Sequence, residues 1–153
     1  MRSRNSQLVL AVASHGGHWV QMRRLMSAFE GLPIHYVSTT AGVAHEVAPF
    51  PVSVVRDANL QDKVALVRLA LETFWIVART RPAYVLSTGA APGFFALMFG
   101  KLFGARTIWV DSLANADCMS VSGAKVQPFA DLWLTQWPEL EISGGPLYRG
   151  AVL

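Results

Sequence analysis

The sequence has little of what a secreted, disulfide-bonded or nucleic-acid-binding protein requires. Its single cysteine, Cys118, excludes an internal disulfide framework and fits a reducing compartment. Charged residues make up only 15% of the chain, whereas an average soluble domain has about 25%. The lysines and arginines are scattered, with no aromatic residues interleaved for base stacking, so we expect no nucleic-acid partner.

Targeting signals and long apolar runs are also missing. Residues 8–13 are apolar but too few for a signal peptide, and they predict a strand. The only uncharged run of spanning length, residues 83–100, is interrupted by Ser87-Thr88-Gly89 and by Pro92-Gly93. A spanning helix needs about 20 mainly apolar residues. We therefore expect no signal peptide and no clear transmembrane helix.

Apolar residues and positive charge are what the sequence does contain. The hydrophobic fraction is 52% and the mean hydropathy is +0.34, which is high for a free-standing soluble protein. This composition calls for a large core, a partner subunit or a membrane surface. The net charge of +3 suits an anionic partner such as lipid headgroups or phosphorylated substrates.

Strand-like and helix-like segments alternate along the chain, a pattern typical of a mostly parallel sheet covered by helices. Strands are expected at residues 8–13, 34–38, 52–55, 84–87, 107–110 and 132–135. Helices are expected at residues 17–29, 43–48, 61–79, 93–103 and 123–130, with Asn59 capping the third and Pro92 opening the fourth. The fold class predicted is α/β: one Rossmann-like domain over residues 1–153, with about six strands and helices on both faces.

Two of the expected helices are unusually apolar. Only Arg68, Glu72 and Thr73 interrupt the apolar sequence between Lys63 and Arg79, and the segment "GFFALMFGKLFG" carries a single lysine. Burial between the sheet and neighbouring helices explains such segments, because a surface helix normally has a wider polar face. The alternative is an external apolar face for a membrane or partner. The candidates for that face are Trp75, Phe94, Phe95 and Phe99.

The turn "SHGGHW" follows the first expected strand, and ligands bind at the carboxyl ends of strands in open parallel sheets. Gly16 and Gly17 allow close approach to the backbone, and the N–H groups that open the next helix suit a phosphate or diphosphate. His18 can accept a hydroxyl proton or donate to an oxyanion. A packing turn with His18 as a cap stays open. No further His or Cys cluster supports a metal held by His15 and His18, so no metal is expected.

Two other strand ends carry polar residues. Thr88 and Gly89, in "STGAAPG", lie next to a second helix start, so two anion-binding helix N-termini are expected to face one cleft. A simple turn explains this segment equally well. Asp111 and Ser112 end the fifth strand in "WVDS". Asp111 is a candidate for a catalytic base, a hydroxyl ligand or a cap of the following turn.

Together these segments resemble one family over nearly the whole chain. The matching stretches are "SHGGHWVQM", "STGAAPG", "IWVDSLANADCMSVSGAKVQPFADLWLTQWPEL" and "PLYRGAVL". The family comprises the membrane-associated acceptor subunit of the eukaryotic dolichol-linked, chitobiose-forming N-acetylglucosaminyltransferase and bacterial relatives. The sequence is most similar to the bacterial exopolysaccharide glycosyltransferase subunits, including glucuronosyltransferase components.

The resemblance implies the N-terminal half of a GT-B glycosyltransferase on a chain of its own. In this family that half binds the lipid-linked acceptor and touches the membrane, and a partner chain binds the UDP-sugar; no cofactor is implied. The resemblance assigns substrate contacts to Ser14, Gly16, Gly17, Thr88, Gly89 and Ser112. The reaction needs a base for the acceptor hydroxyl, and we expect His18 in that role with Asp111 as the fallback. Whether His18 acts as base or as phosphate ligand stays open.

The expected function is that of an acceptor-binding subunit in a two-chain, inverting UDP-sugar glycosyltransferase. It would extend a polyprenyl-diphosphate-linked glycan in exopolysaccharide biosynthesis and be inactive alone. We expect no N-terminal anchor and no second nucleotide-binding half on this chain, and therefore peripheral attachment to the cytoplasmic face of the inner membrane.

Two other functions are alternatives. A non-catalytic membrane scaffold that recruits the catalytic subunit explains the apolar helices equally well. A different nucleotide-binding enzyme is disfavoured, because only Glu46 is available as the acidic ribose ligand after the second strand.

Overall fold

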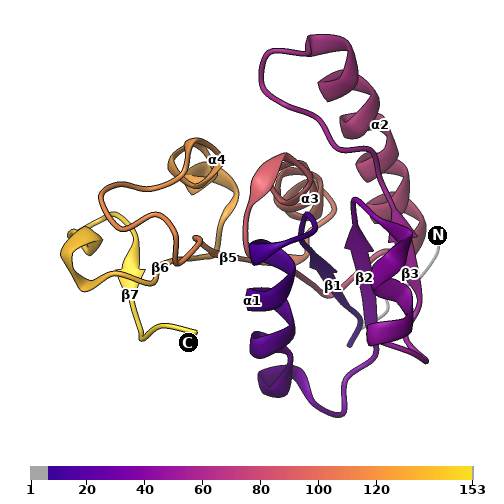
Figure 1. Cartoon of the computed structure of the whole chain (residues 1–153), viewed down its shortest axis with the longest axis horizontal. Helices are drawn as coiled ribbons and strands as arrows, with labels where there is room; N and C mark the ends of the chain where they lie inside the picture. Colours follow the sequence, from indigo (N-terminus) through magenta and orange to yellow (C-terminus); the bar gives the residue numbers. More distant parts are fainter. Residues whose placement is uncertain (1–6, 153) are drawn as a thin grey trace.

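The computed structural model describes residues 7–152, which form a seven-stranded, fully parallel sheet (Figure 1). Its order is β3-β2-β1-β4-β5-β6-β7. The strands are β1 Val9–Val12, β2 Ile34–Ser38, β3 Val52–Val54, β4 Tyr84–Ser87, β5 Arg106–Val110, β6 Leu132–Thr135 and β7 Leu147–Tyr148. The predicted α/β class is confirmed. The expected number of strands was one too low, because β7 has two residues and no periodicity to detect.

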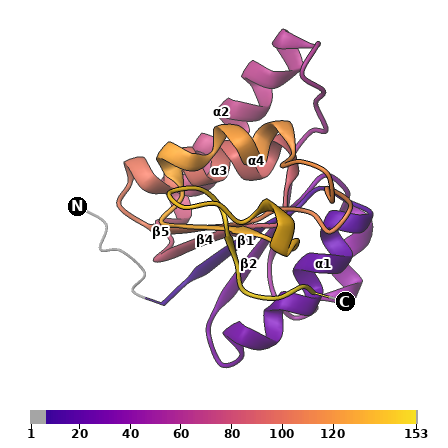
Figure 2. The same ribbon diagram turned by 90° about the vertical axis from the view of Figure 1, so that its left-hand side faces the viewer.

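Helices cover both faces of the sheet, as predicted. The α-helices are α1 Gly17–Leu25, α2 Lys63–Thr80, α3 Ala90–Leu102 and α4 Val121–Lys125. Short 3₁₀ helices are η1 Met26–Phe29, η2 Ala41–Glu46, η3 Gln127–Phe129 and η4 Pro138–Leu140. Figure 2 shows α1 on one side of the sheet and α2, α3 and α4 on the other.

Strand β1 is buried on both faces and separates two cores. Leu10 and Val12 belong to the core beneath α2 and α3, with Leu97 of α3. Val9 and Ala11 belong to the core beneath α1. This two-sided burial explains why the strand appears in the sequence as a continuous apolar run without polar alternation.

Two helices begin elsewhere than the sequence indicated. Asp62, not Asn59, caps α2, because its Oδ1 accepts from the Ala65 N–H at 2.9 Å. Asn59 Oδ1 instead accepts from the N–H groups of Gln61 and Asp62 in the preceding turn. Helix α3 begins at Ala90, so Pro92 occupies its third position rather than its first.

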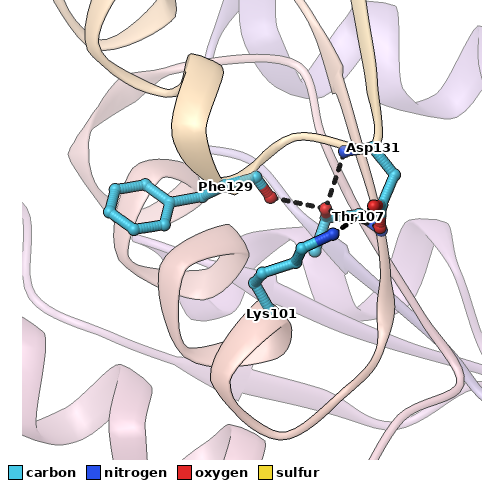
Figure 3. A network of polar contacts seen from close by, with 4 residues as sticks. All are labelled: Lys101, Thr107, Phe129 and Asp131. Atoms are coloured by element: carbon cyan, nitrogen blue, oxygen red, sulfur yellow. Dashed lines mark hydrogen bonds and ion pairs between the residues drawn. The ribbon is translucent and has the colours of Figure 1, made fainter.

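A polar cluster at the amino edge of the sheet ties β5 to β6 and α3 (Figure 3). Asp131 Oδ2 accepts from the Thr107 N–H at 2.9 Å, and Asp131 also forms an ion pair with Lys101. Thr107 Oγ1 donates to the Phe129 carbonyl at 2.5 Å. Burial raises the pKa of the Asp131 carboxyl, but the Lys101 and Thr107 hydrogen bonds outweigh it and hold the pKa below its usual value.

Candidate functional site

The site lies where the strand order reverses. The chain passes from β1 to β2 on one side and from β4 to β5 on the other, and β1 and β4 are neighbours with Val12 opposite Ser87. In open α/β sheets the crevice at such a switch point binds ligands. The turns after β1 and β4, which the sequence singled out, therefore meet at this crevice.

His18 and Thr88 connect these two turns by a pair of hydrogen bonds. His18 Nδ1 lies 2.9 Å from the Thr88 carbonyl oxygen, and Thr88 Oγ1 donates to the His18 carbonyl at 2.6 Å. A carbonyl oxygen only accepts, so the Nδ1 atom carries a proton, and in the neutral ring Nε2 then has the lone pair. The half-buried imidazole is therefore held in the tautomer that accepts a proton at Nε2.

Gly89 provides the space that the His18 ring occupies. A Cβ atom at this position would lie 2.5 Å from His18 Cε1 and Nδ1, and the backbone φ of 139° disfavours any side chain. The next residue, Ala90, has a φ of 68°, which is unfavourable for a residue with a Cβ. The backbone is thus strained at the point where the imidazole lies against it.

The turn after β1 leaves the start of α1 open. Gly16 has a φ of 82° and caps α1 without a side-chain hydrogen bond, and the first turn contains no acidic residue. Cβ atoms added to Gly16 or Gly17 would meet nothing within 4 Å. The N–H groups at the positive end of the helix dipole are therefore accessible, which favours an anion such as a phosphate.

His15 lies at the same turn but is held apart from His18. Its Nδ1 is 2.9 Å from Thr39 Oγ1, and its backbone N–H donates to the same oxygen at 3.1 Å. The exposed His15 ring is thereby fixed beside the segment that follows β2. Within residues 7–152, no group of three or more His, Cys, Asp or Glu side chains is placed to hold a metal ion.

Asp111 lies at the end of β5 with a fully engaged carboxylate. It is 1% exposed. Its Oδ1 accepts from Trp109 Nε1 at 3.0 Å and from Ser120 Oγ at 2.6 Å. Its Oδ2 accepts from the Ser120 N–H at 2.8 Å and from Asn115 Nδ2 at 3.2 Å. Four donors and complete burial suit an anchor for the loop between β5 and α4, not a base that meets substrate.

Two buried glutamines complete the support of the site, and sequence reasoning missed both. Gln21 Nε2 donates to Ser112 Oγ at 3.2 Å, and Gln21 Oε1 accepts from Gln136 Nε2 at 2.6 Å. This network ties the turn of α1 that follows His18 to the carboxyl ends of β5 and β6. The one available signal was the spacing of three residues between His18 and Gln21, which places them on the same side of a helix.

The residues expected to bind substrate therefore fall into two groups. Gly16 and Gly17 are exposed and His18 is half-buried at the switch point, whereas Ser14, Thr88, Gly89 and Ser112 are buried around it. The buried side chains of Thr88 and Ser112 are used in internal hydrogen bonds.

Of the two apolar helices, α2 has more exposed apolar side chains than α3. Val64, Val67, Leu71 and Trp75 are 56–63% exposed. Phe94, Phe95 and Phe99 are half-buried, and Phe99 packs edge-to-face on Phe74 with ring centroids 5.3 Å apart. Contacts with Phe74 of α2 and Phe129 of η3 cover part of Phe99 and Phe94, so these rings are less exposed than the side chains named on α2. No helix in residues 7–152 combines the length and the apolar content needed to cross a membrane.

Comparison with characterised proteins gives relatives for most of the chain, although no protein-family model matches it. The UDP-N-acetylglucosamine transferase subunit ALG14 of Yarrowia lipolytica is 35% identical over 71 residues, which cover 42% of this chain and 33% of that protein. Human ALG14 is 27% identical over an alignment that covers 90% of this chain and 79% of the human protein. The chain is a homologue of ALG14.

Solved structures agree with this ALG14 homology at the level of the fold. MurG of Acinetobacter baumannii superposes with a TM-score of 0.77 at 10% identity, covering 95% of this chain and 45% of MurG. At that identity the likeness concerns the fold alone. The chain matches the N-terminal half of a GT-B fold, as the sequence resemblance implied, and it spans less than half of the MurG chain.

Proposed function

We propose that this ALG14 homologue is the acceptor-binding, membrane-associated subunit of a two-chain UDP-sugar glycosyltransferase. It would extend a polyprenyl-diphosphate-linked glycan, as in exopolysaccharide biosynthesis, while a partner chain binds the UDP-sugar. One observation carries the proposal: the His18 imidazole presents Nε2 beside an open glycine turn at the switch point of the sheet. The homology to a UDP-N-acetylglucosamine transferase subunit supports it.

In the proposed reaction His18 acts as the general base. Its Nε2 takes the proton of the acceptor hydroxyl while the hydroxyl oxygen bonds to the anomeric carbon of the donor sugar. The bond from that carbon to UDP breaks on the opposite side, so the configuration inverts. The imidazolium that forms is stabilised because its Nδ1–H already donates to the Thr88 carbonyl.

The start of α1 would bind phosphate oxygens during this step. Its uncapped N–H groups and helix dipole face open space at Gly16 and Gly17. Preorganised donors of this kind stabilise negative charge without reorganising during the reaction. They serve either the diphosphate of the acceptor or the phosphates of a donor held by the partner.

Attachment to the membrane is proposed through the outer face of α2, defined by Val64, Val67, Leu71 and Trp75. These residues follow one another at intervals of three and four, so they form one stripe along the helix. Arg68 and Arg79 are exposed and lie seven and four residues from Trp75, on the same side. An apolar stripe with a tryptophan and flanking arginines suits an interface of anionic lipids, here the cytoplasmic face of the inner membrane.

Substitution of His18 separates this proposal from a non-catalytic scaffold. The complex of this chain with a co-expressed donor-binding polypeptide would be assayed for transfer from a UDP-sugar to a lipid-linked acceptor. His18→Ala should lower kcat by about 10² or more while the complex stays assembled. The control is His45→Ala, at an exposed histidine in η2. Unchanged transfer in His18→Ala would favour the scaffold.

A further inference from the structure

A second hollow lies next to the crevice, between the loop that precedes α2, the start of α3, and α4. It consists of two adjoining cavities of about 270 Å³ and about 570 Å³, which share Leu60, Ala91 and Ser122. We call it the α3–α4 groove. Its apolar part is lined by Leu60, Ala91, Phe94, Phe95 and Val121, with Lys125 beside them.

We infer that the α3–α4 groove binds the part of the acceptor lipid nearest its diphosphate, that is, the first isoprene units of the apolar chain. The inference rests on the proposed function and adds a location for the lipid. It has four supports: the place of the groove beside His18, its fixed apolar walls, its continuity with the outer face of α2, and its positive charge.

The larger cavity of the groove begins at the turn that holds the His18 ring. Ala90 lines the larger cavity and directly follows Gly89, on which the His18 ring rests. A diphosphate at the crevice would thus have the mouth of the groove beside it. An apolar chain attached to that diphosphate needs an apolar path at this point, because exposing it to water is unfavourable.

The walls of the groove are held in place by packing. Phe94 lies edge-to-face on Phe95 and on Phe129, with centroid distances of 5.6 Å and 5.8 Å. These rings are half-buried against the core, so they present a preformed apolar surface. Ligand sites in proteins are generally preformed, largely apolar cavities with a few polar groups.

The opposite wall is a loop that is fixed to α2. Arg56 forms an ion pair with Glu72 at 2.8 Å, and its N–H donates to the same carboxylate at 3.0 Å. Asn59 Oδ1 closes the turn that presents Leu60 by accepting from two N–H groups. Leu60 therefore has a defined place at the rim, although it is 54% exposed.

Leu60 also joins the groove to the outer face of α2. Leu60 lies in the turn that leads directly into α2, whose residues Val64, Val67 and Leu71 are all exposed. An isoprene chain leaving the groove at Leu60 therefore meets the surface proposed to lie on the membrane. This continuity favours a lipid occupant over an apolar peptide, which would not need to reach the bilayer.

Lys125 supplies the charge that a lipid diphosphate requires. It is exposed on α4 and borders the groove. Its ammonium group and the N-terminal end of α3 are both attractive to an anion at the same end of the molecule. An uncharged lipid would gain nothing from either feature.

A second apolar hollow near α3 provides the matched control. It measures about 390 Å³ and is lined by Met98, Phe99, Leu102, Pro128 and Phe129, with Lys101 beside them. It has the same kind of lining, but it lies toward the other end of α3, near the amino edge of the sheet. It shares no lining residue with the α3–α4 groove.

Binding of farnesyl diphosphate to the full chain tests the inference, with inorganic diphosphate and farnesol as comparison ligands. By calorimetry, farnesyl diphosphate should bind at least about tenfold more tightly than inorganic diphosphate, because the groove adds apolar burial. Ala91→Trp, which fills the groove, should remove that difference, and Met98→Trp should leave it. Lys125→Gln should weaken the binding of farnesyl diphosphate and leave the binding of farnesol unchanged.

Equal affinity of farnesyl diphosphate and inorganic diphosphate would overturn the inference. So would equal loss of binding in Ala91→Trp and Met98→Trp. If Ala91→Trp does not fold, Ser122→Trp fills the same groove from α4 and decides the question. Transfer by the complex without any effect of the groove variants would defeat this inference but leave the proposed function standing. Binding of farnesyl diphosphate in the groove, without transfer by the complex, would support this inference and contradict the proposed function.

Discussion

Gly89 is the residue whose substitution should affect His18 most directly. Gly89→Ala places a Cβ 2.5 Å from the imidazole, so the ring has to move. We expect kcat to fall by about 10², since a displacement of about 1 Å in a catalytic group has effects of that size. Kinetics of the complex at saturating acceptor would measure it.

Gly144→Ala is the matched control for that substitution. Gly144 also has a positive φ, 76°, but an added Cβ would meet nothing within 4 Å. Both variants carry a backbone penalty of about 1–3 kcal/mol, and only one disturbs His18. An equal loss of kcat in the two variants would contradict the placement of His18 in the reaction.

Asp111 should matter for stability and not for proton transfer. Asp111→Asn replaces one carboxylate oxygen by an amide that cannot accept from Ser120 or Trp109. We expect the free energy of unfolding to fall by about 1–3 kcal/mol, the usual effect of leaving a buried polar group unpaired. Denaturant unfolding measures this. The pH dependence of kcat should keep its shape, and loss of its acidic limb would instead identify Asp111 as the base.

At the scale of elements, Asp131 makes the junction of β5, β6 and α3 sensitive to acid. Its pKa is lowered in the folded protein, so the carboxylate stabilises the fold above its unfolded pKa of about 3.9. That stabilisation is lost as the pH falls through the lower folded pKa. Asp131→Asn should therefore be less stable than wild type at pH 7, and the difference should shrink below about pH 4. A constant difference down to pH 2 would contradict this.

The outer face of α2 is the element predicted to meet the membrane. Leu71→Glu should reduce co-sedimentation with anionic vesicles by about tenfold or more, since it places a charge in the apolar stripe. The melting temperature should change little, because Leu71 is 56% exposed. Leu102→Glu, at a residue 72% exposed on α3, is the control. Equal vesicle binding by wild type and both variants would refute this membrane surface.

The elements that the sequence predicted well are those with strong local signals. The apolar run of β1 and the breaks at Gly89 and Pro92 predict both turns of the site from the sequence alone. Helix caps were less predictable, because Asn59 and Asp62 are both good capping residues and the choice depends on the loop's path. The two-residue strand β7 exists only because β6 offers it an edge.

The roles of the site residues depend on contacts between residues that are distant in the sequence, so the sequence alone did not decide them. Whether Asp111 faces substrate or the protein depends on Ser120, nine residues further along the chain, and on Trp109. The pairing of Gln21 with Gln136 joins residues 115 positions apart. Neither contact leaves a periodic signal, so the sequence supplied the candidates but not their roles.

For the molecule as a whole, the decisive question is whether the active site is shared between two chains. The chain has the fold of a GT-B N-terminal half and places His18 at an open crevice. A partner that brings a UDP-sugar to that crevice would complete the site. Neither chain would then be active by itself.

The most direct measurement is transfer from a UDP-sugar to a membrane-extracted lipid acceptor, with this chain alone, with the donor-binding polypeptide alone, and with both. The account predicts product only from the pair, and its loss when the pair carries His18→Ala. Full activity from either chain alone would contradict the division of labour proposed here.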